Sequence, residues 1–214
     1  MPLTRETSWA EPQPKGRVPA PGELALVQSF LNSRWDLERD RVEVLASVEA
    51  LAGWLSARGL LADDRRLTDD DLARALAVRE GLRAMAFANN GHPLDERATE
   101  AMGGASEAAS LRIRLEPDGA RFLPNTDAGL EGAIGVLYAI VARAMADGSW
   151  ERLKACPGRR CGWVFYDRSR NQSARWCATR ICGDQERARA YYRRHWMRRL
   201  DRLETLIESK EDGT

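Results

Sequence analysis

Apolar residues recur at helical spacing through the first part of the chain and predict a series of amphipathic helices. The first helix has its apolar stripe at Leu24, Val27, Phe30 and Leu31. The second follows Ser47, a favourable N-cap residue, and ends at Gly59, where glycine adopts a left-handed C-cap at least cost. The third begins at the capping-box pair Thr68 and Asp71, and a short fourth helix follows Pro93.

The pattern changes near residue 110. Strict alternation of apolar and polar residues between Leu111 and Leu115, followed by the turn sequence Pro117-Asp118-Gly119, predicts a small β-hairpin. Asp127 then precedes a long apolar helix that breaks at Gly148. The first 150 residues therefore predict a mainly α domain with a minor β element.

The last third of the chain predicts a different arrangement. Residues 163–166 favour a strand, 167–171 a turn, and 174–181 a helical turn that carries Cys177. Asp184 can cap a long terminal helix from about Gln185 to Glu208. These elements predict a hairpin followed by a helix.

Four cysteines lie in this region as two pairs, Cys156-x4-Cys161 and Cys177-x4-Cys182, separated by a fifteen-residue insert. Two short loops that each supply two thiolates are typical of a tetrahedral zinc site. With four protein ligands the site is closed, so we expect one structural Zn²⁺ per chain, whose removal unfolds the C-terminal third while the helical domain persists. The alternatives are four buried free cysteines or an iron–sulfur cluster.

Composition indicates a globular protein, because 43% of the 214 residues are hydrophobic. No run approaches eighteen uninterrupted apolar residues, and the opening residues 1–21 lack the apolar core of a secretory signal. We therefore expect a cytoplasmic protein with no membrane partner. Cytoplasmic thiols are kept reduced, which favours a metal over disulfides.

Charge is distributed unevenly along the chain although the formal net charge is +1. Residues 151–200 hold 14 Lys and Arg against 4 Asp and Glu, which leaves the remainder with nine more acidic than basic residues. A basic segment of this density around a zinc site favours a nucleic-acid partner, and a solvated helical face is the alternative.

The residues around the cysteines resemble a known zinc finger. Residues 156–194, with Cys-Gly-Trp-Val-Phe-Tyr-Asp-Arg-Ser-Arg-Asn from Cys161, the tripeptide Arg175-Trp176-Cys177 and the pair Cys182-Gly183, are similar to the zinc finger of the CGNR family of bacterial proteins. Asp184 and Gln185 stand where that family has Asn and Arg, a change that keeps a capping residue and removes one cation.

The preceding region resembles the ABATE domain that accompanies this finger. The similarity lies in Phe30-Leu31-Asn32-Ser33, Trp54-Leu55, Gly59-Leu60 and the stretch from Leu76 to Leu82. The resemblance implies a stress-response transcription regulator. With it, we expect a mobile leader at 1–20, a helical ABATE-like domain at 21–150, and a zinc finger with a basic C-terminal helix at 151–214.

The function that follows is DNA binding through the zinc finger, with the helical domain used for effector sensing or dimerisation. The alternatives are a protein-interaction adaptor or an RNA-binding module that uses the same basic finger. No glycine-rich phosphate loop, nucleophile elbow or catalytic histidine arrangement is present, so we expect no enzyme, although a hydrolase using carboxylates alone is not excluded.

The predicted contacts with nucleic acid come from the finger and the start of its helix. Arginine forks suit phosphate oxygens and guanine edges, and the candidate residues are Arg168, Arg170, Asn171, Arg175, Arg180 and Arg187. Alternatively, Arg168 and Arg175 brace the finger by pairing with Asp167 and Asp184. Trp163 and Trp176 are interpreted as the small core of the zinc site, with base stacking as the alternative.

Two further partners are predicted. Polar residues at the edges of apolar helices are expected to line a pocket for a small anionic effector, namely Asn32, Arg34, Trp35 and Arg79. On the terminal helix an apolar stripe predicts a homodimer, with packing against the chain's own helices as the alternative. Its members are Tyr192, Trp196, Leu200, Leu203 and Ile207.

Overall fold

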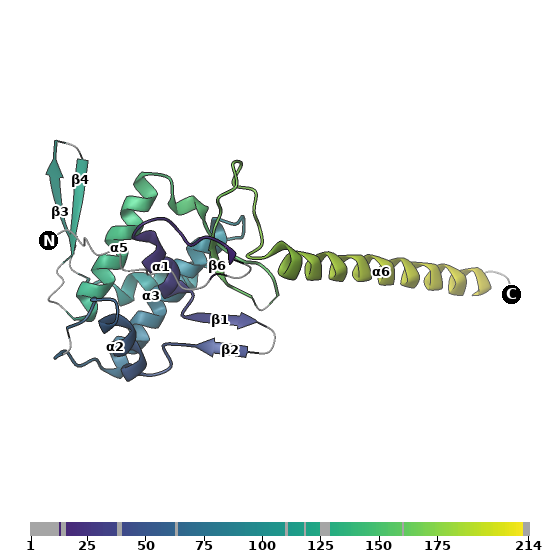
Figure 1. The fold of residues 1–214 in the computed structure, drawn as a ribbon. Coiled ribbons are helices and arrows are strands. Elements are labelled where there is room, and N and C mark those ends of the chain that lie inside the picture. Colours follow the sequence, from purple (N-terminus) through teal and green to yellow (C-terminus); the bar gives the residue numbers. More distant parts are fainter. Residues whose placement is uncertain are drawn as a thin grey trace.

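The computed structural model of the chain describes residues 13, 16–37, 40–62, 64–109, 111–117, 119–124, 129–159 and 161–211, with the backbone alone at 36–37, 40–42 and 201–211. Helices dominate, and a long terminal helix follows a segment in which four cysteines cluster (Figure 1). The predicted fold class, mainly α with small hairpins and a C-terminal four-cysteine module, is confirmed.

Three helices form the centre of the molecule: α1 (Leu24–Leu31), α3 (Asp69–Ala88) and α5 (Leu130–Ala146). Each of them contacts the other two. All eight residues of α1 are buried, which explains why the sequence of this helix is so apolar. The centre of the core is formed by side chains that are almost completely excluded from solvent, among them Leu31, Val78, Leu82 and Leu137.

Two shorter helices, α2 (Val48–Ser56) and α4 (Glu96–Ala105), complete this helical body. The predicted caps are present: the Ser47 hydroxyl accepts a hydrogen bond from the Ala50 amide, and Thr68 and Asp71 form a complete capping box. Helix α4 lies close against α3, because a Cβ atom at Gly81 would stand 2.3 Å from the Met102 Cβ. Only glycine allows that approach.

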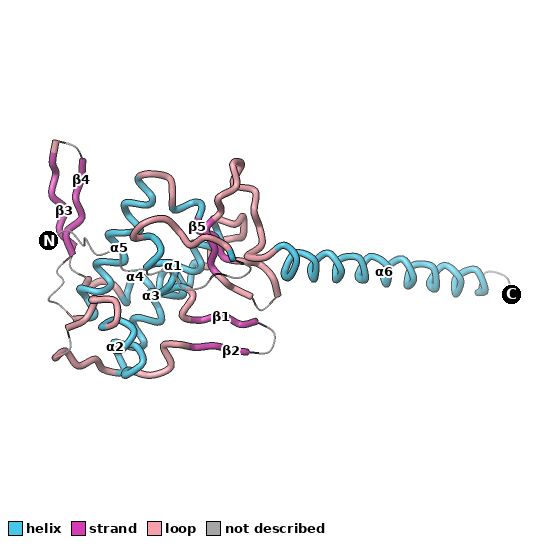
Figure 2. The backbone as a smooth tube through the Cα atoms, in the orientation of Figure 1, coloured by secondary structure: helices cyan, strands magenta, loops and turns pink. Residues whose placement is uncertain are grey.

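Two β-hairpins accompany the helical body in the part of the chain before the finger (Figure 2). The predicted one pairs β3 (Leu111–Glu116) with β4 (Gly119–Pro124) in antiparallel register. The other pairs β1 (Arg34–Leu37) with β2 (Asp40–Glu43), again antiparallel, and was not predicted. Its strands have four residues each, too short for a clear alternating pattern.

The finger consists of short elements followed by a long helix. A 3₁₀ turn (Trp150–Arg152) leads into β5 (Leu153–Ala155), which pairs antiparallel with β6 (Val164–Tyr166). A π-type turn (Thr179–Gly183) then leads into α6 (Asp184–Glu211). The helical turn thus begins after Cys177, not at 174 as the sequence predicted, and Asp184 is the first residue of α6 instead of its cap.

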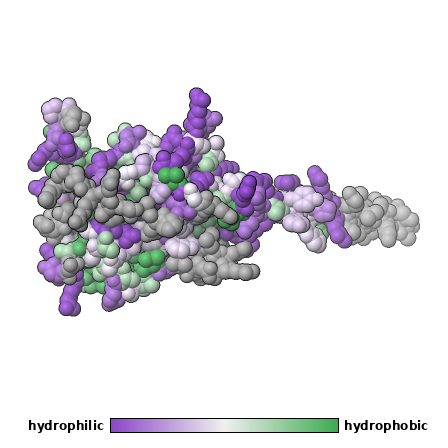
Figure 3. All heavy atoms as spheres, viewed as in Figure 1, coloured by the Kyte–Doolittle hydropathy of each residue, from purple (hydrophilic) through white to green (hydrophobic). Residues whose placement is uncertain are grey.

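Helix α6 extends away from the body for most of its length (Figure 1). At 28 residues it is about 42 Å long. Where its side chains are described, Figure 3 shows mainly hydrophilic residues with paler ones between them.

The strands of the finger share the core of the helical body. Leu153, Ala155, Val164 and Tyr166 are buried in the same hydrophobic cluster as α1, α3 and α5. A second, smaller cluster contains the four cysteines with Trp163, Phe165 and Ala178. The interpretation of Trp163 as part of a small core beside the cysteines is therefore confirmed.

Helix α5 begins at Leu130. Its N-cap residue is Gly129, at φ +64°, and no side chain makes a capping hydrogen bond there. Asp127, the predicted cap, lies outside the described residues.

Among the described helices, none combines the length and the apolar character that a membrane crossing requires.

Candidate metal centre and nucleic-acid interface

The first cysteine pair is held by a tight backbone loop between β5 and β6. The Cys156 amide donates to the Trp163 carbonyl at 2.9 Å, and the Cys161 amide donates to the Gly158 carbonyl at 2.8 Å. Gly162, at φ +62°, takes the left-handed conformation that lets the chain return into β6. We call the segment from Cys156 to Gly162 the knuckle.

The second pair converges on the same point from the other side. The Cys182 amide donates to the Ala178 carbonyl at 2.9 Å within the π-type turn, which brings Cys182 back toward Cys177. Gly158 of the knuckle packs closely against Cys182. A Cβ atom at Gly158 would stand 3.0 Å from the Cys182 Cβ and 3.1 Å from the Cys182 Sγ. The glycine therefore lets the knuckle approach the second cysteine pair.

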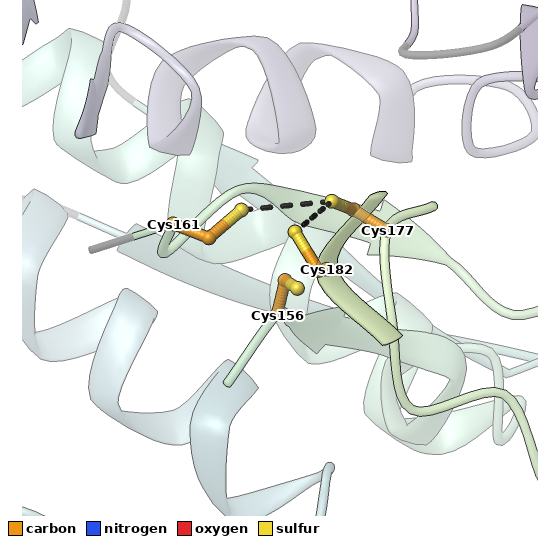
Figure 4. A group of neighbouring side chains, drawn as sticks. All are labelled: Cys156, Cys161, Cys177 and Cys182. Atoms are coloured by element: carbon orange, nitrogen blue, oxygen red, sulfur yellow. Dashed lines mark hydrogen bonds between the residues drawn. The ribbon is translucent and has the colours of Figure 1, made fainter. Parts of the chain in front are cut away.

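The four sulfur atoms point toward one another and lie within 4.8 Å of each other (Figure 4). The Cys161 and Cys177 Sγ atoms are 3.5 Å apart, and those of Cys177 and Cys182 are 3.7 Å apart. A tetrahedron with Zn–S bonds of about 2.3 Å places its sulfurs about 3.8 Å apart. The donor set and its spacing therefore fit zinc.

Burial adds to this fit. All four cysteines are buried, and none forms a disulfide. The pKa of the Cys177 thiol is raised because it contacts the Cys156, Cys161 and Cys182 sulfurs and is shielded from water. Deprotonation of all four thiols therefore needs a cation among them. The site holds one structural Zn²⁺, and with four thiolates bound the metal has no position left for substrate.

A buried ion pair supports the loop that connects the two cysteine pairs. The Lys154 Nζ lies 2.8 Å from the Asp167 Oδ2, and both side chains are almost fully buried. The Asp167 carboxylate also accepts hydrogen bonds from the Ser169 amide and hydroxyl and from the Ala174 amide. Lys154 in turn donates to the Gln172 carbonyl. The loop from 167 to 174 is thus fixed from within.

This arrangement contradicts the predicted bracing pairs. Asp167 is paired with Lys154 and not with Arg168, while Asp184 is paired with Arg187 and not with Arg175. Lys154 was not predicted from the sequence, because a lysine between Leu153 and Ala155 has the same pattern as an exposed strand residue. Its burial depends on a partner thirteen residues away.

The predicted nucleic-acid residues divide into two groups. Arg170, Arg175 and Arg180 are exposed, and within the described part of the chain their guanidinium groups have no hydrogen-bond or ion-pair partner. Asn171 is also exposed. In the second group, Arg168 donates to the Pro19 carbonyl at 2.8 Å and lies over the Tyr166 ring, and Arg187 is paired with Asp184. Three cations of the finger are thus left with solvent as their surroundings.

The finger is joined to the helical body by side chains that bond to its backbone. Asn32 donates to the Val164 carbonyl and accepts from the Val164 amide, both at 2.8 Å. Asn90 donates to the carbonyls of Ala155 and Arg175 at 2.8 and 2.9 Å. These bonds satisfy edges of β5 and β6 that the two-stranded sheet leaves open.

Part of the segment predicted as a leader also contacts the finger. The Arg17 guanidinium donates to the Trp176 carbonyl at 2.9 Å and lies over the Phe165 ring. The Trp163 indole donates to the Gln13 side chain at 3.1 Å. Gln13 and Arg17 therefore connect the N-terminal segment to the finger, in addition to the bonds from Asn32 and Asn90.

The predicted effector residues do not share one pocket. Asn32 is used by Val164, as above. Arg79 is 1% exposed and makes a bidentate ion pair with Glu43, at 2.6 and 2.7 Å, and a bond to Ser33. Of the four, Arg34 and Trp35 line a cavity that the described residues form between α3 and the knuckle.

A body of packed helices that carries a closed four-cysteine site and a basic terminal helix defines a helical protein with a structural zinc finger. The chain belongs to the ABATE family: the family model, described as "Putative stress-induced transcription regulator", matches residues 24–148. The model of the CGNR zinc finger matches residues 152–195. Both resemblances seen in the sequence are thereby confirmed. A search of curated proteins gives no match to this chain.

Proposed function

We propose that this protein is a transcription regulator of the cytoplasm that binds DNA through its zinc finger. The observation that carries the proposal is the group of three exposed guanidinium groups, at Arg170, Arg175 and Arg180, that have no partner among the described residues. Unpaired arginines suit phosphate contacts, since each can donate two parallel hydrogen bonds to an oxyanion. The family description, which names a regulator and no enzyme, supports the same function.

Arg170 and Arg175 lie on a fixed loop of the finger, and Arg180 lies in the π-type turn between Cys177 and Cys182. The zinc site holds the loop at Cys161 and Cys177, and the Lys154–Asp167 pair holds it from beneath. A loop that is already ordered loses little conformational entropy when it binds. We propose residues 151–214 as the DNA-binding module and residues 21–150 as the helical module that supports it.

Replacing Arg170 with alanine is expected to lower DNA affinity and to flatten its dependence on salt. A phosphate-contacting arginine releases roughly one counterion, so the slope of log affinity against log salt concentration should fall by about one unit. Fluorescence anisotropy with a random-sequence duplex between low and moderate salt measures the slope. Arg112→Ala is the matched control, because Arg112 is an exposed residue of β3, in a hairpin far from α6 (Figure 1).

An unchanged slope with Arg170→Ala and a lower melting temperature would assign Arg170 to the stability of the loop. Absence of any duplex binding at low salt would overturn the DNA-binding proposal and favour the adaptor function. Tighter binding to structured RNA than to duplex DNA would favour the RNA-binding alternative.

We also propose that two copies of the chain associate through α6. Five large apolar side chains near its middle are 46–62% exposed, namely Tyr191, Tyr192, Trp196, Met197 and Leu200. Leu203 and Ile207, predicted to continue the stripe, lie where only the backbone is described. The spacing of Trp196, Leu200, Leu203 and Ile207 by four, three and four residues is that of a coiled-coil seam.

Trp196→Gln is expected to convert a dimer into a monomer or to weaken it by at least tenfold, since the tryptophan is the largest apolar residue of the stripe. Light scattering after size exclusion, over a range of protein concentrations, measures the mass. Arg194→Gln is the control, because Arg194 lies on another face of the same helix. A monomeric mass for the unchanged protein at micromolar concentration would exclude this dimer.

A further inference from the structure

The cavity between the helical body and the knuckle has a volume of about 380 Å³. One wall comes from β1 and α3, through Arg34, Trp35 and Phe87, and the other from Pro157, Gly158 and Arg159 of the knuckle. Cys156 and Cys161 also line it on the knuckle side, whereas Cys177 and Cys182 do not, so the cavity lies beside the metal site and shares two of its four cysteines. Its volume is within the range of small-molecule sites.

We propose that this cavity binds a small organic anion, a carboxylate attached to a flat apolar group. Two cations are placed to receive the carboxylate. The Arg159 side chain is exposed and has no partner among the described residues, and the Arg34 side chain is 55% exposed, with its guanidinium 3.5 Å from Glu80. Both remain available to a ligand because neither is enclosed by strong hydrogen bonds.

The third arginine in the cavity has a different role. Arg83 is buried and already donates to the carbonyls of Gly162, Leu31 and Arg34 and to the Glu80 carboxylate. Burial lowers its pKa, which indicates how poorly solvated its charge is. It therefore adds positive potential to the cavity floor and fixes the knuckle at Gly162, but it has few donors left for a ligand.

The apolar part of the ligand has aromatic surfaces to contact. Trp35 and Phe87 are both half-buried members of the lining, on β1 and α3. Trp35 is held in place by an edge-on contact with Trp163, with ring centroids 5.2 Å apart. Inorganic phosphate would use the arginines and leave these rings unused. The cavity therefore favours an aromatic carboxylate over a simple oxyanion.

A ligand in this position would join two parts of the chain. Arg34 and Trp35 belong to the helical module, and Arg159 lies between Cys156 and Cys161 in the knuckle. Binding would favour the arrangement in which the knuckle is closed on the metal. Occupancy should therefore slow the release of zinc. That this coupling also changes DNA affinity rests on the proposed function above.

Benzoate is the probe that tests the site, with benzamide as the neutral control of the same shape. Isothermal titration of the zinc-loaded full chain is expected to show benzoate binding at least tenfold more tightly than benzamide, since charge-assisted bonds to arginine are lost with the amide. The Arg34→Ala/Arg159→Ala variant should weaken benzoate by at least tenfold. Arg112→Ala should leave it unchanged.

A second measurement follows zinc transfer to a coloured chelator. Saturating benzoate is expected to slow transfer severalfold in the unchanged protein and to have no effect in the double variant. Equal binding of benzoate and benzamide, full binding by the double variant, or no binding at all would each overturn the proposal. DNA affinity measured on the same samples is independent of these results: loss of DNA binding with benzoate binding intact removes the proposed function and leaves the site standing.

Discussion

Replacing Cys161 with serine is expected to remove the zinc and to unfold the whole chain, not only its last third. The strands that hold the knuckle contribute Leu153, Ala155, Val164 and Tyr166 to the same core as α1, α3 and α5. Structural zinc contributes about 10 kcal/mol or more, which equals or exceeds the total stability of a typical domain. The core cannot lose two strands and remain closed.

Zinc content by mass spectrometry and thermal unfolding by far-ultraviolet circular dichroism measure this effect together. Thr179→Ser is the control, because Thr179 is an exposed neighbour of the site that binds no metal. A Cys161→Ser protein without zinc but with an unchanged melting transition for the helical body would show that the finger unfolds alone, as the sequence had suggested.

Replacing Lys154 with methionine is expected to lower the free energy of unfolding by about 3–5 kcal/mol. The change leaves the buried Asp167 carboxylate without its cation, although its hydrogen bonds from Ser169 and Ala174 remain. Urea unfolding measures the loss. The Lys154→Met/Asp167→Asn variant should recover part of it, because the unpaired charge is then gone. A loss below about 1 kcal/mol would contradict a buried pair of this kind.

The same pair makes stability depend on pH. Burial acts to raise the pKa of Asp167, but the Lys154 and Ser169 hydrogen bonds outweigh it and hold that pKa below its ordinary value of 3.8. A carboxyl group whose pKa is lower in the folded state than in the unfolded state stabilises the folded protein at pH values above its unfolded-state pKa. Its contribution is therefore present above about pH 4 and is lost as the pH falls further. The Asp167→Asn variant should therefore show a weaker dependence of the free energy of unfolding on pH in that acidic range, as measured by urea unfolding at several pH values.

Most of the helical architecture could be predicted from local signals in the sequence. Ser47, Gly59 and the Thr68–Asp71 pair mark helix ends through bonds within one turn, so the sequence contains the needed information. The paired spacing of the cysteines likewise predicts the metal site, because two short loops can fold around one ion only in a few ways.

What the sequence did not predict depends on contacts between distant residues. Asn32 and Arg79 were expected beside an effector, yet their side chains are used by Val164 and by Glu43. Strand β5 has three residues, and it is defined by its pairing with β6 and by Asn89 and Asn90 of the helical body. A polar residue beside an apolar helix face is expected to have a hydrogen-bond partner once it is buried, but the sequence does not identify that partner.

The bonds from Asn32 and Asn90 to the finger backbone also bear on how such a finger can be reused. Classical zinc fingers are small domains whose folding is coupled to binding of their metal. Here an excised segment 152–195 would expose the Val164 amide and carbonyl and the Ala155 carbonyl, which Asn32 and Asn90, just after the C-terminal ends of α1 and α3, now satisfy. A chimera that keeps the loop from 167 to 174 in its present conformation must therefore import both of these helices along with the cysteines.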